Sequence, residues 1–202
     1  MKELIIGTTN QAKIEQIRGV LARAGFIVNG LPNGFILDVA EDGQTAQENA
    51  RKKAVAYAVA LGVDVLSMDN ALYFDGLAPE QQPGINVRRV NGRTDRPSDE
   101  ELLAYYSKLV RSLGGRVNGQ WEFAVCIAKP DGEFQETTII SPRVFVGEAS
   151  PKVIVGYPLE SIQIDPESGK YISEMSRQEQ DEFWQRKIGR ELEEFVKKVI
   201  RL

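Results

Sequence analysis

The chain has 202 residues, 42% of them hydrophobic and 27% charged, which is typical of a globular protein and predicts a single domain, residues 1–202. Its 25 basic and 29 acidic residues give a net charge of −4, too little positive charge to attract nucleic acid. The absence of histidine excludes His general bases, Ser-His-Asp nucleophiles and His-ligated metal sites. No apolar run approaches the roughly 18 residues that span a bilayer, and the start MKELIIGTTN turns polar too soon for a secretory signal. We therefore expect a cytoplasmic protein with neither nucleic acid nor membrane as a partner.

The first third of the chain predicts alternating strands and helices. Residues 3–7 read as a strand, and apolar residues at helical spacing follow from residue 11, with Asn10 as the N-cap. The loop between them presents backbone N–H groups at a helix N-terminus, which suits an anion. Residues 26–30 and 35–39 read as further strands, before an alanine-rich helix between Thr45 and Gly62.

The rest of the chain adds a strand, a long loop, two helices and a hairpin. Residues 63–68 predict a strand, and residues 69–97 are punctuated by Gly and Pro as in a loop. A capping box at 98–101 opens one helix, and a second at 176–179 opens the last. Between them, strands at 119–129 and 133–146 flank a Pro-Asp-Gly turn. The single cysteine, Cys126, lies in the apolar run of the first of these strands, where we expect a buried, inert thiol.

Polar residues recur where ligands collect in α/β proteins. Lys13 follows the first turn, Glu48 and Lys53 share a predicted helix, and Asp69 comes directly after a buried-looking strand. Two carboxylates together with a phosphate are a ligand set that holds Mg²⁺. Each residue also has an ordinary interpretation: Glu48 as a surface partner of Lys52, Lys13 as a solvated helix residue and Asp69 as a turn former.

Three motifs together resemble the inosine/xanthosine triphosphate pyrophosphatase family, whose members hydrolyse deaminated purine nucleoside triphosphates to a monophosphate and pyrophosphate. TTNQAK is similar to the family's S/T-x-N-x-x-K opening, TAQENARKKA to T-x-x-E-N-A-x-x-K-A, and QPGINVRR to P-G-x-x-x-x-R. The resemblance spans most of the chain. It implies an α/β fold with a long mixed twisted sheet flanked by helices, in two lobes around a central nucleotide-binding cleft, and a homodimer.

The resemblance also assigns roles to residues of this sequence. Asp69 matches the catalytic aspartate, which would activate or position the attacking water and, with Glu48, hold Mg²⁺. Residues expected to contact the triphosphate are Thr8, Thr9, Asn10, Lys13, Lys53 and Arg89. Arg88 and Arg93 make the loop around Arg89 basic as well, although basic loops are more often simply solvated.

The sequence departs from the family at the acidic motif. SMDNALYFDGL stands where the family has D-D-S-G-L, so Met68 replaces the first aspartate, Asn70 the serine and Ala71 the glycine. Fewer anionic ligands weaken a cation site. The acids that would compensate, if the fold brings one close, are Asp75, Glu41 and Asp42.

The end that recognises the base departs further. Near the C-terminus, Gln180, Trp184 and Gln185 replace the family's lysine, serine and histidine, and Arg186 is retained. The segment that encloses the purine is reduced to VGYPLES, in which Gly156 and Tyr157 are recognisable. We expect Tyr157, Trp184, Gln185 and Arg186 to contact the base, although a core position for the tryptophan fits the last helix equally well.

The resemblance therefore predicts a Mg²⁺-dependent nucleoside triphosphate pyrophosphatase, acting on deaminated or otherwise modified purine nucleotides with altered base recognition. Phosphate and metal contacts are common to any triphosphate, whereas contacts to the base edge set specificity. Two alternatives remain open. One is a catalytically silent relative that binds nucleotides or serves in assembly, and the other is an enzyme for a modified or pyrimidine triphosphate.

Overall fold

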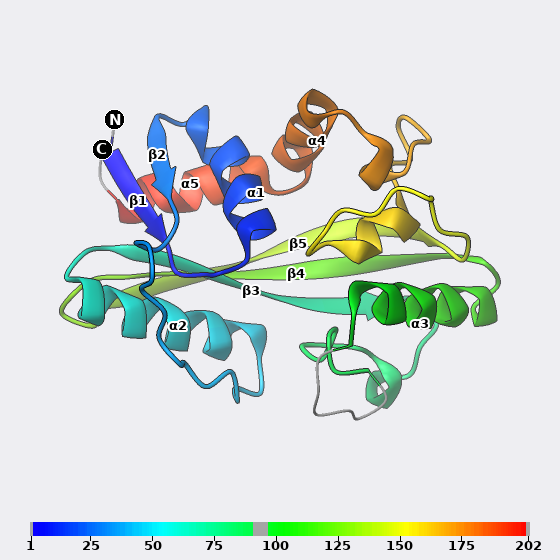
Figure 1. Cartoon of the computed structure of the whole chain (residues 1–202), viewed down its shortest axis with the longest axis horizontal. Coiled ribbons are helices and arrows are strands. Elements are labelled where there is room, and N and C mark those ends of the chain that lie inside the picture. Colours follow the sequence, from blue (N-terminus) through cyan, green and yellow to red (C-terminus); the bar gives the residue numbers. More distant parts are fainter. Residues whose placement is uncertain (1, 91–96, 201–202) are drawn as a thin grey trace. The chain divides into compact units, whose positions relative to one another are not determined.

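The computed structural model describes residues 2–90 and 97–200 (Figure 1). It contains helices and strands in the mixed order expected for an α/β protein. The helices are α1 (Gln11–Ala22), α2 (Ala46–Leu61), α3 (Asp99–Ser112), α4 (Arg177–Trp184) and α5 (Arg190–Val199). The strands are β1 (Lys2–Ile6), β2 (Phe26–Asn29), β3 (Val65–Phe74), β4 (Arg116–Ala128), β5 (Phe134–Val146) and β6 (Gln163–Ile164).

One mixed sheet contains all six strands, in the order β2-β1-β3-β4-β5-β6. Strand β1 pairs in parallel with β2 and β3, as crossover helices require, while β5 and β6 are antiparallel. The predicted α/β class with a long mixed sheet is confirmed. No helix in the described part of the chain is long and apolar enough to cross a membrane.

The chain divides into two compact units, and the long strands contribute residues to both. The first unit comprises residues 1–70, 122–140 and 184–202, and the second comprises residues 71–121 and 141–183. Whether they act as the single domain expected from the length stays a prediction.

The first unit is built on the parallel strands and the helices that connect or cover them. Helix α1 packs against β2 and lies beside α5, and Figure 1 shows α2 on the other side of the strands. Thr45 and Gly62 cap α2 as predicted, and Gly62 has a φ of +68° that favours glycine there. Cys126 is fully buried, as expected, and burial raises the pKa of its thiol to about 12.

The second unit has its own apolar core beneath α3. Helix α3 begins at the predicted capping box, in which Ser98 and Glu101 exchange side-chain and backbone hydrogen bonds. Its apolar face packs with the end of β3 and the short helix Pro158–Ile162. The buried residues of this core are Leu72, Phe74, Val87, Val90, Leu102, Tyr106, Val110, Phe145, Leu159 and Ile162.

Three sequence expectations about local structure are wrong. Residues 35–39 form no strand, because the hydroxyl of Tyr57 bonds the backbone of Leu37 where a strand partner would be. Strand β3 continues to Phe74, and the segment read as the start of a loop buries Ala71, Leu72 and Phe74 in the core. The last helix is interrupted by a π-helical turn, Gln185–Gly189, between α4 and α5.

Candidate active site

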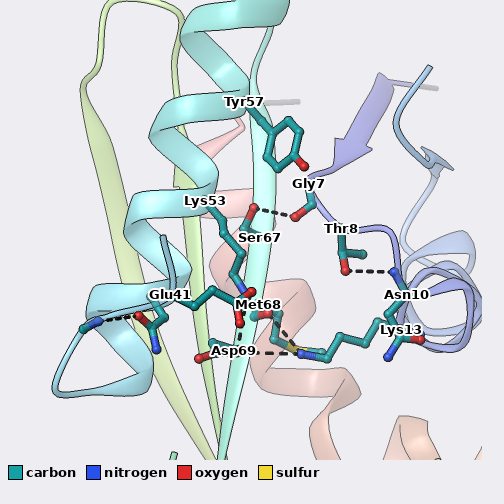
Figure 2. Close-up of polar contacts among 12 residues, drawn as sticks. Gly7, Thr8, Asn10, Lys13, Glu41, Lys53, Tyr57, Ser67, Met68 and Asp69 are labelled. Atoms are coloured by element: carbon teal, nitrogen blue, oxygen red, sulfur yellow. Dashed lines mark hydrogen bonds and ion pairs between the residues drawn. The ribbon is translucent and has the colours of Figure 1, made fainter. Parts of the chain in front are cut away.

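The turn after β1 approaches β3 closely and then starts α1. A Cβ on Gly7 would lie 2.4 Å from the hydroxyl oxygen of Ser67, so only glycine fits there. The Ser67 hydroxyl in turn donates to the carbonyl of Gly7 over 3.2 Å (Figure 2). This pair was not among the residues predicted from the sequence, although a glycine directly after a strand signals such a close approach. The contact fixes the turn against the strand that carries Asp69.

Asn10 caps helix α1 as predicted. Its side-chain oxygen accepts hydrogen bonds from the backbone N–H groups of Ala12, over 3.0 Å, and Lys13, over 3.3 Å. The backbone N–H of Asn10 donates to the Thr8 hydroxyl over 3.2 Å, whereas Thr9 is exposed. The Asn10 side chain therefore already occupies part of the anion-binding helix terminus. Contacts of Thr8, Thr9 and Asn10 with a triphosphate stay predictions.

Two lysines from different helices converge on Asp69. Lys53 Nζ of α2 lies 3.3 Å from Asp69 Oδ1, and Lys13 Nζ of α1 lies 4.0 Å from the same atom. Lys13 also donates to the carbonyl of Met68 over 3.3 Å (Figure 2). The three side chains are only 11–16% exposed, so their charges are weakly screened. The structure thus brings together three of the predicted site residues, and we call them the lysine–aspartate cluster.

Glu41 joins this cluster through Lys53. Its carboxylate accepts from Lys53 Nζ over 3.1 Å, so one ammonium group bridges Glu41 and Asp69. Asn49 holds the loop that carries Glu41, because its buried amide oxygen accepts from the backbone N–H of Gly43 over 2.8 Å. Of the acids considered as compensation for Met68, Glu41 is the one that the structure places in contact with Lys53.

The other acids near α2 have different partners. Asp42 pairs with the exposed Lys52 over 2.5 Å, and this contact lowers the pKa of the Asp42 carboxyl. Glu48 Oε2 accepts from the backbone N–H of Gln44 over 2.6 Å, so Glu48 helps to cap α2. No hydrogen bond or ion pair joins Glu48 to Asp69 in residues 2–90 and 97–200. Lys52 therefore pairs with Asp42, not with Glu48 as the surface interpretation required.

The donor set around Asp69 fits a cation that is shared with a phosphate, and does not form a complete cage. Among the described residues, no three or more acidic, Cys or His side chains are grouped so that they could hold a metal ion. Both lysine contacts of Asp69 are made to Oδ1, so Oδ2 is the oxygen suited to a cation or a water. Mg²⁺ in phosphate-transfer sites commonly takes one or two carboxylates and completes its shell with phosphate oxygens and water.

The replaced motif positions lie beside Asp69 on β3. Consecutive strand residues face opposite sides, so the side chain of Met68 points away from the face that carries Asp69. Met68 is 2% exposed and packs as a core residue. The side-chain oxygen of Asn70 is buried without a hydrogen-bond partner among the described residues. Asp75 is exposed just beyond β3 in the second unit, and its compensating role stays a prediction.

The predicted arginine loop lies in the second unit. Arg89 is exposed, and its side chain makes no hydrogen bond or ion pair with any other residue that the structure describes. Arg88 instead pairs with Asp99 and donates to the carbonyl of Gly156. Arg93 lies outside the described residues. The two neighbouring arginines therefore have different environments, which their sequence alone does not reveal.

Tyr157 lies in the same unit, next to buried charges. Burial raises the pKa of Glu160 to about 8, an effect that the charge of Arg143 partly opposes. Burial also lowers the pKa of Arg143 to about 9, so its guanidinium remains charged at neutral pH. The partly buried phenol of Tyr157 has a pKa raised well above its usual range by burial and by Glu160. The sequence analysis missed Glu160, because its burial depends on tertiary structure.

The C-terminal candidates lie at and around the π-helical turn. Trp184 is 9% exposed and meets the ring of Phe123 edge-on, with centroids 6.2 Å apart. Gln185 donates to Glu193 over 2.7 Å, and Arg186 is exposed. Gln180, in the second unit, donates to the carbonyls of Ile172 and Met175. Base contacts by Tyr157, Trp184, Gln185 and Arg186 stay predictions.

Comparisons with known proteins identify relatives over nearly the whole chain. A dITP/XTP pyrophosphatase from Exiguobacterium sp. is 33% identical over 184 residues, which cover 88% of this chain and 87% of the relative. A dITP/XTP pyrophosphatase from Gloeobacter violaceus is 30% identical over 87% of this chain and 84% of the relative. The Staphylococcus aureus Ham1 protein, a solved structure, has a TM-score of 0.68 and 26% identity, covering 97% of this chain and 98% of that one.

A second solved structure, a HAM1 protein from Coxiella burnetii, has a TM-score of 0.75 and 18% identity. The match covers 98% of this chain and 100% of that one, and it supports the fold. The model of the Ham1 family matches residues 4–195, which include the lysine–aspartate cluster and the segment around Tyr157. The chain belongs to the Ham1 family.

Proposed function

We propose that the chain is a nucleoside triphosphate pyrophosphatase, which hydrolyses its substrate to a nucleoside monophosphate and pyrophosphate. The observation that carries the proposal is the convergence of Lys13 and Lys53 on one oxygen of Asp69 in a weakly exposed site. The names of the curated relatives support the reaction, since they are dITP/XTP pyrophosphatases.

The two lysines provide the positive charge that a triphosphate needs. In the proposal, Lys13 and Lys53 turn from Asp69 toward phosphate oxygens when the nucleotide binds, and the N-terminus of α1 and Arg89 add further donors. Preorganised positive groups stabilise charge that grows on the leaving pyrophosphate. The same contacts are available for any base, so they define a substrate class and not a preferred nucleotide.

Asp69 accepts a proton from the attacking water in this proposal. The water oxygen forms a bond to the α-phosphorus, the bond from that phosphorus to the α–β bridging oxygen breaks, and its electron pair leaves with pyrophosphate. The water proton passes to the Asp69 carboxylate and then to solvent. The product that carries the new oxygen is therefore the nucleoside monophosphate.

Mg²⁺ is the proposed cofactor, and it would supply charge neutralisation at the phosphates. Asp69 would hold it, with Glu48 as the second protein ligand expected from the family resemblance. Glu41 is the alternative carboxylate, because it already shares Lys53 with Asp69. Exchange of the Lys53 contact for a phosphate would free Glu41 to approach a cation.

The proposed substrates are deaminated purine nucleotides, with base recognition altered relative to the family. The names of the relatives support hypoxanthine and xanthine, the bases of dITP and XTP. Tyr157, Trp184, Gln185 and Arg186 are the proposed contacts to the base. The homodimer and the cytoplasmic location stay predictions.

The test is pyrophosphate release from a panel of ribo- and deoxyribonucleoside triphosphates whose bases are hypoxanthine, xanthine, adenine, guanine and the pyrimidines. Each assay is run with Mg²⁺ and again with excess chelator. We expect one or a few preferred triphosphates, with turnover that the chelator abolishes. Binding of nucleotides without any turnover would contradict the proposal and favour the catalytically silent relative.

A further inference from the structure

Two adjacent arginines in the second unit do different things. Arg89 matches the arginine of the P-G-x-x-x-x-R motif, whereas Arg88 occupies a position that this motif leaves open. The structure leaves Arg89 exposed and gives Arg88 two polar contacts, one to Asp99 and one to Gly156, and a third hydrogen bond from Gly156 to Asp99 closes the arrangement. Arg88 is therefore committed to the protein itself and is not a free phosphate donor.

The closed arrangement captures both polar groups of the Gly156 backbone. Arg88 Nη2 donates to the Gly156 carbonyl over 2.7 Å, and Arg88 Nη1 donates to Asp99 Oδ1 over 3.2 Å. The other Asp99 oxygen, Oδ2, accepts from the Gly156 N–H over 2.9 Å. A guanidinium fork and a carboxylate are suited to such two-point contacts because their donors and acceptors are fixed in a plane.

Gly156 lies within a tight turn that leads into Tyr157. The N–H of Tyr157 donates to the carbonyl of Ile154 over 2.9 Å, which closes a four-residue turn. Gly156 has a φ of +85°, as a type II turn requires at its third position. Val155, at the tip of the turn, is 86% exposed. The contacts of Arg88 and Asp99 therefore fix the backbone of this turn at Gly156.

Core residues lie next to Arg88 and Asp99 in the chain and hold them in place. Val87 and Val90 are buried on either side of the arginines, and the Tyr106 hydroxyl donates to the Val87 carbonyl over 3.0 Å. Asp99 is the first residue of α3, directly after its N-cap. The core beneath α3 thus holds Arg88 and Asp99 next to the Ile154–Tyr157 turn.

Stability alone does not account for this arrangement. The side chains of Arg88 and Asp99 are 36% and 30% exposed, and ion pairs at that exposure add little to the free energy of unfolding. Their geometric effect is larger, because a turn held in one conformation loses less entropy when a ligand binds. The turn also contains the part of the purine-enclosing segment that this sequence retains.

We propose that Arg88 and Asp99 are positioning residues that hold the Ile154–Tyr157 turn in its binding conformation and thereby set the base preference of the enzyme. The inference rests on the proposed function, because it assigns the turn to the base end of that site. The base itself contacts the turn, through Tyr157, and not Arg88 or Asp99.

The test uses Arg88→Lys, which keeps the charge but loses the planar fork, and Asp99→Asn, which keeps the shape but loses the charge. The matched control is Arg116→Lys, an exposed arginine in the same unit. We expect both variants to lower the ratio of kcat/KM for the preferred triphosphate over the next-best base by about tenfold, through KM, with kcat nearly unchanged. The control should keep the wild-type ratio. Equal losses for all bases, with the ratio unchanged, would mean a merely structural role and overturn the proposal.

Amide hydrogen exchange provides a second readout that is independent of turnover. We expect the Gly156 N–H to exchange faster in both variants, while the amide of Tyr106 in the core keeps its protection. Unchanged exchange at Gly156 would overturn the proposal. If the wild-type protein releases no pyrophosphate, the proposed function fails, and the base ratio is then measured from nucleotide dissociation constants. Loss of that ratio in the variants still supports positioning, and its retention contradicts it.

Discussion

The lysine–aspartate cluster and the Ile154–Tyr157 turn differ in how their polar groups are held. In the cluster, charged side chains that the family motifs predict meet one another directly, with Lys13 and Lys53 on Asp69. In the turn, the backbone of Gly156 is held by Arg88 and Asp99, neither of which a family motif identifies. The comparison shows that the cluster is held by side chains that the family motifs name, whereas the turn is held by side chains that the motifs do not name.

This difference has a consequence for substrate selection. Changes in the cluster should affect all nucleoside triphosphates to a similar degree, because every one of them presents the same phosphates. Changes around the turn should affect bases unequally. A base-dependent effect of a cluster variant, or an equal effect of a turn variant on all bases, would contradict this expectation.

Asp69→Asn should have the largest effect. The substitution removes the proton acceptor and keeps the side-chain shape, so we expect kcat to fall by about 10²–10⁴-fold for every substrate, with a thermal midpoint close to wild type. Steady-state kinetics and thermal melting measure the two quantities. Asp64→Asn, the same change at an exposed position just before β3, is the control and should retain full activity.

Lys53→Met and Lys52→Met compare neighbouring lysines of α2. Lys53 lies in the cluster with its side chain 11% exposed, whereas Lys52 is 43% exposed and pairs with Asp42. We expect Lys53→Met to raise KM roughly 10- to 100-fold, by a similar factor for all bases, because a contact to a charged group is lost. Lys52→Met should leave KM nearly unchanged. A base-dependent effect of Lys53→Met would contradict the division between the two regions.

Glu160 gives the second unit a pH-dependent stability. Its pKa of about 8 in the folded protein lies above its ordinary value of 4.5, so the folded state holds an extra proton between these pH values. The free energy of unfolding should therefore fall as pH rises from about 5 to 8, by up to about 1.4 kcal/mol per pH unit. Glu160→Gln should flatten this slope in denaturant titrations at several pH values, and the exposed Glu148→Gln should not. An equal slope in both variants would show that Glu160 is not the responsible group.

Substitutions of Asn10 should have the smallest effect, and two of them distinguish its role in capping α1 from its predicted role in phosphate binding. Asn10→Ala removes the acceptor of the Ala12 and Lys13 N–H groups and should lower the free energy of unfolding by about 1 kcal/mol. Asn10→Asp keeps the cap and its stability but adds a negative charge, so KM should rise for all triphosphates. Denaturant unfolding and steady-state kinetics measure both variants. An unchanged KM in Asn10→Asp would remove Asn10 from the phosphate site.

Much of the fold and of the phosphate end could be predicted because the signals are local. The caps at Asn10, Thr45 and Ser98, and the Pro-Asp-Gly turn of the hairpin, act within a few residues and were read correctly. The family motifs named Lys13, Lys53 and Asp69, and the structure brings them together. The prediction of a strand at residues 35–39 was wrong. There the hydroxyl of Tyr57, which is 20 positions from Leu37 in the sequence, makes hydrogen bonds with the Leu37 backbone.

The remaining features depend on partners far apart in the sequence. The burial of Glu160 and the pairing of Glu41 with Lys53 depend on where the chain folds back. Arg88 and Arg89 look alike in sequence, and only the approach of Gly156, 68 residues from Arg88, distinguishes them. The π-helical turn at Gln185–Gly189 likewise has no local signature, and it lies among the residues expected to contact the base.

Hydrolysis of the preferred triphosphate in ¹⁸O-labelled water tests the central claim most directly, with both products analysed by mass spectrometry. If Asp69 positions water for attack on the α-phosphorus, the label appears in the nucleoside monophosphate and the pyrophosphate remains unlabelled. Label in pyrophosphate, or release of inorganic phosphate and a diphosphate, would contradict that chemistry and the role of the lysine–aspartate cluster in it.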